Sequence, residues 1–454
     1  MAQTLLLQNA RLIDGLGDQP RTNVSILVAG DRITAVEQRP LTPAPDTQVI
    51  DLQGKTVVPG LIDTHVHSTF VGSASLPLFL AAGVTSARDV GGNLAKVKGL
   101  KADLNSGKKL GPRLFICGPL LDGSDKSFAY PSFAEMLDNI PSPEAVPQKI
   151  GALLSAGVDA VKLYFTLPPD TATAIIKFVD NRVPVTGHLG YTHSLDAIKA
   201  GINGLEHVWI SPYNEFCALD MQFGPGASMM SPKFWTQTIK GWEEADLQNP
   251  RAREWFDVMV KHQVNMGTTL DLLWVARCGE EGVKRDQDRC YIPPPTLARQ
   301  RAMASHIGER PDWDIHPGFF DPYQGTKALE KHQQVTKMLH EAGGLVVGGT
   351  DCGALAYPPP GFALLREIEL IADAIGTTAA IKAVTSVAAR YLRQQDNIGS
   401  IAPGRYADFL VIDGDPLRDV RELRKLTSVY RGGIFYDPQA ILAQVPKSDF
   451  VPIA

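Results

Sequence analysis

The middle of this 454-residue chain alternates short apolar, β-rich runs with segments of helical periodicity. Strands that alternate with helices are typical of βα units and of a parallel sheet. Eight such units are present, so we expect an α/β fold with a (β/α)8 TIM barrel. We place its strands near residues 57–63, 84–89, 113–117, 158–163, 183–187, 204–207, 264–268 and 344–349.

Both ends of the chain are β-rich and differ in character from the middle. Residues 24–28 and 33–36 flank Ala29-Gly30-Asp31-Arg32, and residues 427–430 and 434–436 flank Arg431-Gly432-Gly433. Both patterns predict a hairpin. We therefore expect one small β-sandwich domain formed from residues 1–58 and 395–454, with the barrel domain, residues 59–394, inserted between its halves.

Composition narrows the class of protein. The net charge of −5 and the lack of a basic run argue against a nucleic-acid-binding surface. The N-terminus has no basic region, and no apolar stretch is long enough to cross a bilayer, so we expect neither a signal peptide nor a membrane anchor. The five cysteines are widely spaced and form no Cys-x-x-Cys pair, which indicates neither a thiolate metal site nor a disulfide framework. These features favour a cytoplasmic protein whose partner is a small-molecule substrate, and they leave the oligomeric state open, a homo-oligomer included.

Two histidines, His65 and His67, end the first apolar run of the middle region. Side chains two residues apart on a strand point to the same face. The two imidazoles are therefore expected side by side, where both can bind one metal ion. For an isolated His-x-His, an ordinary pair of polar residues closing a strand would be the better interpretation.

Four further polar residues lie at or near the ends of later expected strands: Lys162, His188, His207 and Asp351. Each alone is better explained as a structural polar group, and Lys162 as a lysine that reaches solvent along an apolar surface. Strand ends converge at the mouth of a barrel, however, and imidazoles with a carboxylate are suitable zinc ligands. Taken together, the residues predict a metal site. A desolvated Lys162 can also react with CO₂ to give a carbamate whose oxygens can bridge two metals.

The chain resembles the amidohydrolase superfamily over nearly its whole length, and it looks closest to the imidazolonepropionase- and prolidase-like branch. The motifs that carry the resemblance are Pro59-Gly60-Leu61-Ile62-Asp63-Thr64-His65-Val66-His67, Lys162, His188, Glu206-His207, Thr350-Asp351 and the segment 399–408. The resemblance implies two divalent metal ions, with zinc as the first choice. It implies that His65, His67 and Asp351 bind the first ion, that His188 and His207 bind the second, and that carboxylated Lys162 bridges them.

The resemblance also implies hydrolysis by a hydroxide that bridges the two metals, with Asp351 as general base and then general acid. Prolidase-like members often carry a Ser-Gly-Gly segment soon after the lysine, whereas this chain has Tyr164-Phe165-Thr166. This difference argues against a strict peptide specificity. The expected substrate is an amide, such as a peptide or an N-acyl amino acid, with a lactone or ester as the second choice. A deaminase is disfavoured because no glutamate follows His188 within three residues, and a non-catalytic scaffold because every ligand position is intact.

Several other residues have a candidate role. Tyr164 and Tyr191 are candidate substrate-binding residues, since each lies close in sequence to a metal ligand. Glu206 is expected to point away from His207 and to be structural, and Arg88-Asp89 is expected to form an internal ion pair or a turn. His193 is expected at a helix N-terminus in solvent. Candidate pocket walls are the aromatic residues that follow strand ends, namely Trp209, Tyr213, Trp274 and Tyr357.

Overall fold

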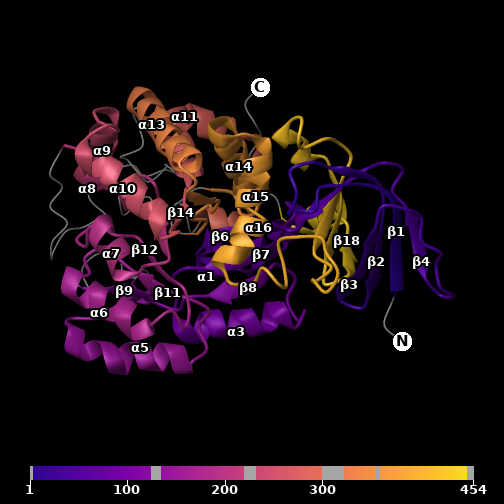
Figure 1. The fold of residues 1–454 in the computed structure, drawn as a ribbon, viewed down its shortest axis with the longest axis horizontal. Helices are drawn as coiled ribbons and strands as arrows, with labels where there is room; N and C mark the ends of the chain where they lie inside the picture. The colour runs from indigo at the N-terminus through magenta and orange to yellow at the C-terminus, as the bar shows by residue number, and fades with distance from the viewer. Residues whose placement is uncertain (1–3, 124–133, 219–231, 299–321, 354–357, 447–454) are drawn as a thin grey trace.

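The computed structural model describes residues 4–123, 134–218, 232–298, 322–353 and 358–446. Two parallel sheets with helices around them form one side of the molecule, and a sheet made by both ends of the chain forms the other (Figure 1). This is an α/β fold. Among the described helices, none is long and apolar enough to cross a membrane.

The terminal sheet joins the two ends of the chain in the order β18-β17-β16-β5-β1-β2-β3, with β4 pairing β1. Leu6 of β1 lies opposite Leu27 of β2, and Val58 of β5 lies opposite Leu410 of β16. The two-layer form of this domain and its boundaries stay predictions. The strands are β1 (Thr4–Leu12), β2 (Arg21–Ala29), β3 (Arg32–Glu37), β4 (Gln48–Asp51), β5 (Thr56–Pro59), β16 (Phe409–Ile412), β17 (Leu426–Arg431) and β18 (Ile434–Tyr436).

The parallel strands form one sheet in the order β6-β7-β8 and another in the order β10-β9-β11-β12-β13-β14-β15. Backbone hydrogen bonds join the two sheets at both seams: Asp351 donates to His65 at 2.8 Å, and Asp159 donates to Ile116 at 2.8 Å. This arrangement is compatible with a TIM barrel. The strands are β6 (Leu61–Val66), β7 (Val84–Asp89), β8 (Arg113–Ile116), β9 (Leu120–Asp122), β10 (Leu137–Asn139), β11 (Val161–Leu163), β12 (Val185–Gly187), β13 (Gly204–Glu206), β14 (Asn265–Gly267) and β15 (Leu345–Val347).

Helices follow most of the parallel strands and bury an apolar face. In α6 the buried residues include Ala172, Ile175, Ile176 and Val179, a spacing that puts them on one side of the helix. The described α-helices are α1 (Ser68–Val71), α2 (Leu76–Ala81), α3 (Leu94–Asn105), α5 (Val146–Ser155), α6 (Pro169–Val179), α7 (Ser194–Ala200), α8 (Tyr213–Phe216), α9 (Pro232–Glu243), α10 (Pro250–Lys261), α11 (Leu270–Lys284), α13 (Pro322–Glu341), α14 (Phe362–Ile375), α15 (Thr377–Ala383), α16 (Ser386–Tyr391) and α17 (Pro438–Gln444).

The expected single strand over residues 57–63 is wrong in one respect, because the chain changes sheets at Gly60. The amide of Gly60 still donates to Asp408 of the terminal sheet at 3.0 Å, whereas the next amide, Leu61, donates to Gly83 at 3.0 Å. A Cβ on Gly60 would overlap with the side chain of Thr85. The absence of a side chain therefore allows the close approach, and hydrophobic periodicity alone does not reveal the change of sheet.

Replacing Gly60 with alanine is expected to destabilise the protein by roughly 1–3 kcal/mol, because the new methyl group overpacks against Thr85. The measurement is the midpoint of thermal or urea unfolding. Gly99→Ala is the matched control: Gly99 is exposed on α3, with nothing within 4 Å of an added Cβ. That variant should be as stable as the parent or more stable, by up to about 1 kcal/mol. Equal midpoints for Gly60→Ala and the parent would contradict this account.

Candidate metal centre

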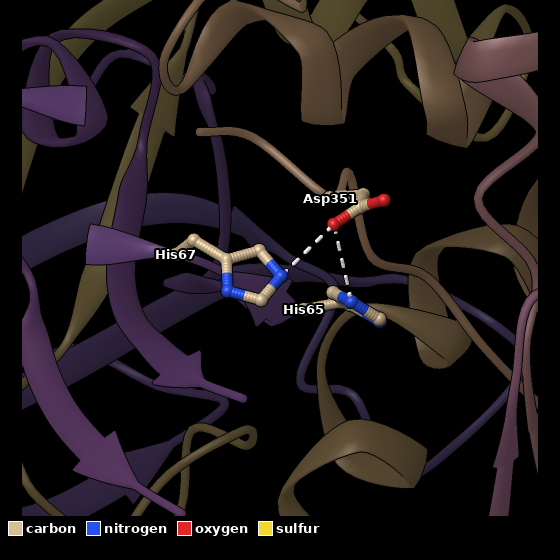
Figure 2. A group of neighbouring side chains, drawn as sticks. All are labelled: His65, His67 and Asp351. Carbon is tan, nitrogen blue, oxygen red and sulfur yellow. Dashed lines mark ion pairs between the residues drawn. The ribbon is translucent and has the colours of Figure 1, made fainter. Parts of the chain in front are cut away.

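Two histidines and one carboxylate converge where β6 and β15 end. His65 and His67 come from the end of β6 and the residue just after it, and Asp351 follows β15. The Nε2 atoms of His65 and His67 lie 3.3 and 3.2 Å from Asp351 Oδ1. Figure 2 shows both imidazoles pointing at that carboxylate, and one ligand atom from each of the three residues lies within 4.8 Å of the other two. This spacing fits a single divalent ion.

Two more histidines extend the group on the side of β12 and β13. The ring centroid of His207 lies 4.5 Å from that of His65 and 4.5 Å from that of His188. His207 Nε2 is 4.0 Å from Asp351 Oδ2, so this carboxylate faces imidazoles on two sides. Lys162, in the middle of β11, is fully buried and influences the pKa of both His188 and His207. The structure thus brings the six residues predicted as ligands into one region.

Three atoms of this group are buried without a hydrogen-bond partner among the described residues: Lys162 Nζ, His188 Nε2 and Asp351 Oδ1. Buried polar atoms almost always have a partner, so three unpartnered atoms in one region need an explanation. Metal coordination supplies it for an imidazole nitrogen and a carboxylate oxygen. The donor set therefore fits divalent metal ions.

Hydrogen bonds fix which nitrogen each imidazole presents. His67 Nδ1 lies 2.8 Å from the carbonyl oxygen of Gly91, which only accepts, so Nδ1 carries the proton. His65 Nδ1 lies 2.8 Å from a carboxylate oxygen of Glu206, with the same consequence. In the neutral form, the lone pair then lies on Nε2, the atom that faces Asp351. This is the arrangement that orients metal-binding histidines in general.

Glu206 has a larger role than the sequence predicted. It is fully buried, and besides His65 it accepts hydrogen bonds from Arg88 at 2.5 Å and from Thr186 at 2.5 Å. Along a regular strand, neighbouring side chains point to opposite faces, which would direct Glu206 away from His207. His207 has a φ of 63°, however, so this alternation of side chains ends at His207. Burial raises the pKa of Glu206, yet Arg88, Lys162 and His65 lower it well below its ordinary value, so it remains a carboxylate.

Arg88 and Asp89 divide the two roles expected of them. Arg88 makes the internal ion pair, with Glu206, and also donates to the carbonyl of Thr64 at 2.7 Å. Asp89 holds a turn by accepting from the amide of Ser68 at 2.7 Å and from that of Gly91 at 3.1 Å. The turn carries the carbonyl that orients His67.

The charges of most of the group suit metal binding; the exception is His67, whose pKa burial lowers but the carboxylate of Asp351 raises above the ordinary value. Burial lowers the pKa of Lys162 to about 8, partly opposed by Glu206, so its neutral amine is accessible near neutral pH. Burial also lowers the pKa of His188 and of His207 well below the ordinary value. The charge of Lys162 adds to this effect for His188, and that of His188 adds to it for His207. Burial raises the pKa of Asp351, but the neighbouring imidazoles, His65 first, hold it well below its ordinary value. Neutral imidazoles and an ionised carboxylate are the forms that bind metals.

The candidate substrate-binding residues differ in position. Tyr164 is buried with its ring centroid 5.0 Å from that of His188, whereas Tyr191 is 37% exposed. Trp209 is buried against both His188 and His207, at 5.6 and 5.2 Å between ring centroids. A substrate role for either tyrosine stays a prediction.

The other residues singled out in the sequence lie elsewhere. Tyr213 packs against Trp242, and Trp274 lies beneath the guanidinium of Arg366. His193 lies at the N-terminus of α7, as expected, but it is half-buried and not fully in solvent. Tyr357 lies outside the described residues.

Comparisons with known proteins agree with this geometry. The amidohydrolase family model matches residues 48–135 and 207–433, which is over half of the chain. His65, His67, His207 and Asp351 fall inside the match, and Lys162 and His188 lie between its two parts.

The curated relatives align over short segments. The chain is 37% identical over 84 residues to the N-acyl-D-glutamate deacylase of Alcaligenes xylosoxydans xylosoxydans, covering 18% of this chain and 17% of that protein. It is 41% identical over 75 residues to the imidazolonepropionase of Vibrio vulnificus (strain YJ016), covering 16% of this chain and 18% of that protein. The chain thus spans less than a fifth of the length of the curated relatives it matches.

A solved structure matches over the whole chain. The crystal structure of a Xaa-Pro dipeptidase with bound methionine in the active site superimposes with a TM-score of 0.65 at 21% identity, covering 96% of this chain and 100% of that one. At this identity, the likeness shows the fold.

If His67 is a metal ligand as predicted, replacing it with asparagine reduces bound metal by about one ion per chain, because the shorter amide does not replace the imidazole. Metal analysis of the purified, reconstituted protein measures this. His193→Asn is the matched control, since His193 lies outside the centre, with its Nδ1 atom 3.1 Å from a guanidinium nitrogen of Arg251. Full metal content in His67→Asn, or an equal loss in both variants, would contradict the assignment.

Proposed function

Because the chain belongs to the amidohydrolase family, we propose that it is a metal-dependent hydrolase that cleaves a carbon–nitrogen bond in a small molecule. The observation that carries the proposal is the convergence of four imidazoles, a lysine and a carboxylate, three of whose buried atoms lack a hydrogen-bond partner among the described residues. The proposed catalytic domain comprises residues 59–394.

The residues divide into two ligand sets in this proposal. His65, His67 and Asp351 hold the first ion, and His188 and His207 hold the second. Lys162, carboxylated on its neutral amine, bridges the two, which the lowered pKa of this buried lysine supports. We propose zinc because neutral imidazole and carboxylate are suitable zinc ligands. When bound, the ions activate water and polarise the scissile carbonyl.

Asp351 is the proposed proton carrier. Its carboxylate has one oxygen close to His65 and His67 and the other 4.0 Å from His207 Nε2, so it borders both ligand sets. An ionised carboxylate in this position can accept a proton from the attacking water and deliver it to the leaving nitrogen. Its pKa, held well below the ordinary value, keeps it in the basic form.

The proposed substrate is an amide, either an N-acyl amino acid or a peptide. The support comes from the names of the relatives, a deacylase of an N-acyl amino acid and a dipeptidase, which differ in substrate but share the bond type. Hydrolysis of a lactone or ester is the second candidate, because the same ligand set can activate water against any acyl carbon.

A substrate panel tests the function. The reconstituted protein is expected to hydrolyse at least one N-acyl amino acid or dipeptide, and Asp351→Asn should reduce that rate about 10²–10⁴-fold, because it removes the proton carrier. Product release measured by chromatography, with lactones, esters and aminated heterocycles in the same panel, gives the readout. Ammonia release from the heterocycles without acyl hydrolysis would overturn the proposal, and lactone or ester hydrolysis alone would favour the second candidate.

Lys162→Ala is expected to lose the bridging group and with it most of the bound metal and activity. Acetate or propionate should partly restore both, because the space left by the lysine admits a carboxylate that replaces the carbamate. Metal analysis with and without acetate measures this, and the parent protein in acetate is the control. Detection by mass spectrometry or density of an unmodified Lys162 in a fully metallated, active protein would contradict the bridging role.

A further inference from the structure

The turn after β14 holds a strained residue against the metal centre. Three residues at the ends of parallel strands have left-handed backbone conformations: His207, Thr269 and Asp351, with φ of 63°, 50° and 57°. His207 and Asp351 belong to the proposed ligand set, whereas Thr269 does not. For a β-branched residue this conformation is rare and costs on the order of 1–3 kcal/mol, so it persists only where other contacts impose it.

The hydroxyl of Thr269 has a defined hydrogen-bond direction. Its Oγ1 donates to the carbonyl of Thr268 at 2.8 Å, which uses its only proton. The same oxygen lies 2.9 Å from His207 Nδ1, so in this contact Oγ1 accepts and the imidazole donates. His207 therefore carries its proton on Nδ1 and has its lone pair on Nε2, the nitrogen nearest Asp351.

Helix α14 holds this turn in place. The carboxyl group of Glu367 is fully buried, and burial raises its pKa to about 8. It accepts from the amide of Asp271 at 2.8 Å and is hydrogen-bonded to the hydroxyl of Thr268. The neighbouring Arg366 donates to the carboxylate of Asp271 at 3.2 Å. Two successive residues of α14 thus bind Thr268, just before Thr269, and Asp271, two residues after it, and these contacts offset the backbone strain.

We propose that Thr269 is a positioning residue that fixes His207 in the tautomer able to bind the second metal ion, and that Glu367 holds Thr269 in place. The inference rests on the proposed function, since it concerns the same centre. Among the described residues, the Thr269 hydroxyl is the hydrogen-bond partner of His207 Nδ1, and its removal leaves the Nδ1 proton without that acceptor. The proton then moves to Nε2, where it occupies the lone pair that a metal needs.

The test compares Thr269→Val with Thr269→Ser and with Thr336→Val. Valine keeps the β-branched shape and removes the hydroxyl, whereas serine keeps the hydroxyl. Thr336 is the matched control, because it is buried in α13 and its hydroxyl donates to the carbonyl of His332 at 2.8 Å. Two readouts are used: zinc affinity by competition with a chelator, and the tautomer of His207 by nitrogen NMR of the metal-free, histidine-labelled protein.

Thr269→Val is expected to bind the more weakly held zinc ion about 10–100-fold less tightly and to shift the His207 nitrogen signals toward the Nε2-protonated form. Thr269→Ser and Thr336→Val should match the parent within a few-fold and leave the signals in place. Unchanged signals and unchanged affinity in Thr269→Val would overturn the inference. If the parent itself binds no second ion, the proposed function fails, while the NMR comparison still decides the role of Thr269.

Glu367→Leu tests the second half of the inference. Leucine removes both oxygens that contact Thr268 and Asp271, so the turn is held less firmly although the Thr269 hydroxyl is present. Affinity for the same zinc ion should fall, by less than in Thr269→Val, and the NMR signals of His207 should show a mixture of tautomers. Parent-like behaviour in both measurements would exclude Glu367 from the positioning role.

Discussion

A neutral imidazole carries one proton, and the hydrogen-bond partner of one ring nitrogen decides whether the other presents its lone pair to a metal. This constraint shapes the centre. The Nδ1 atom of each of three histidines has a hydrogen-bond partner: Glu206 for His65, the carbonyl of Gly91 for His67, and the hydroxyl of Thr269 for His207. The partners come from three different segments, so the tautomers depend on the packing of several βα units and not on the ligand residues alone.

The position of Glu206, and with it the hydrogen bond to His65, depends on the buried ion pair of Glu206 with Arg88. Removing one partner from a buried ion pair costs about 3–5 kcal/mol, because the other charge remains without compensation. Here Arg88 also binds the carbonyl of Thr64 next to His65, and its guanidinium lies 4.3 Å from the ring centroid of Tyr391. The pair therefore ties β7, β13 and α16 to the first ligand strand. Stability of the strand ends and geometry of the candidate metal site come from the same contacts.

Much of the architecture could be predicted from the sequence, because apolar runs and strand-end histidines are local patterns. The eight predicted strands all have counterparts, and the six predicted ligand residues lie in one region. The change of sheet at Gly60 could not be predicted, since it depends on the position of Thr85 in space. The contact of Glu206 with His65 and the position of Thr269 beside His207 could not be predicted for a related reason. Left-handed residues at the strand ends break the alternation from which side-chain direction is inferred.

The most direct measurement is a crystal structure of the zinc-reconstituted protein, with anomalous diffraction collected at the zinc absorption edge. The account predicts two anomalous peaks, one among His65, His67 and Asp351 and the other beside His188 and His207, with additional density on Lys162 Nζ between them. A single peak with an unmodified Lys162 would contradict the two-metal centre. Peaks away from all of these residues would contradict the assignment of the site.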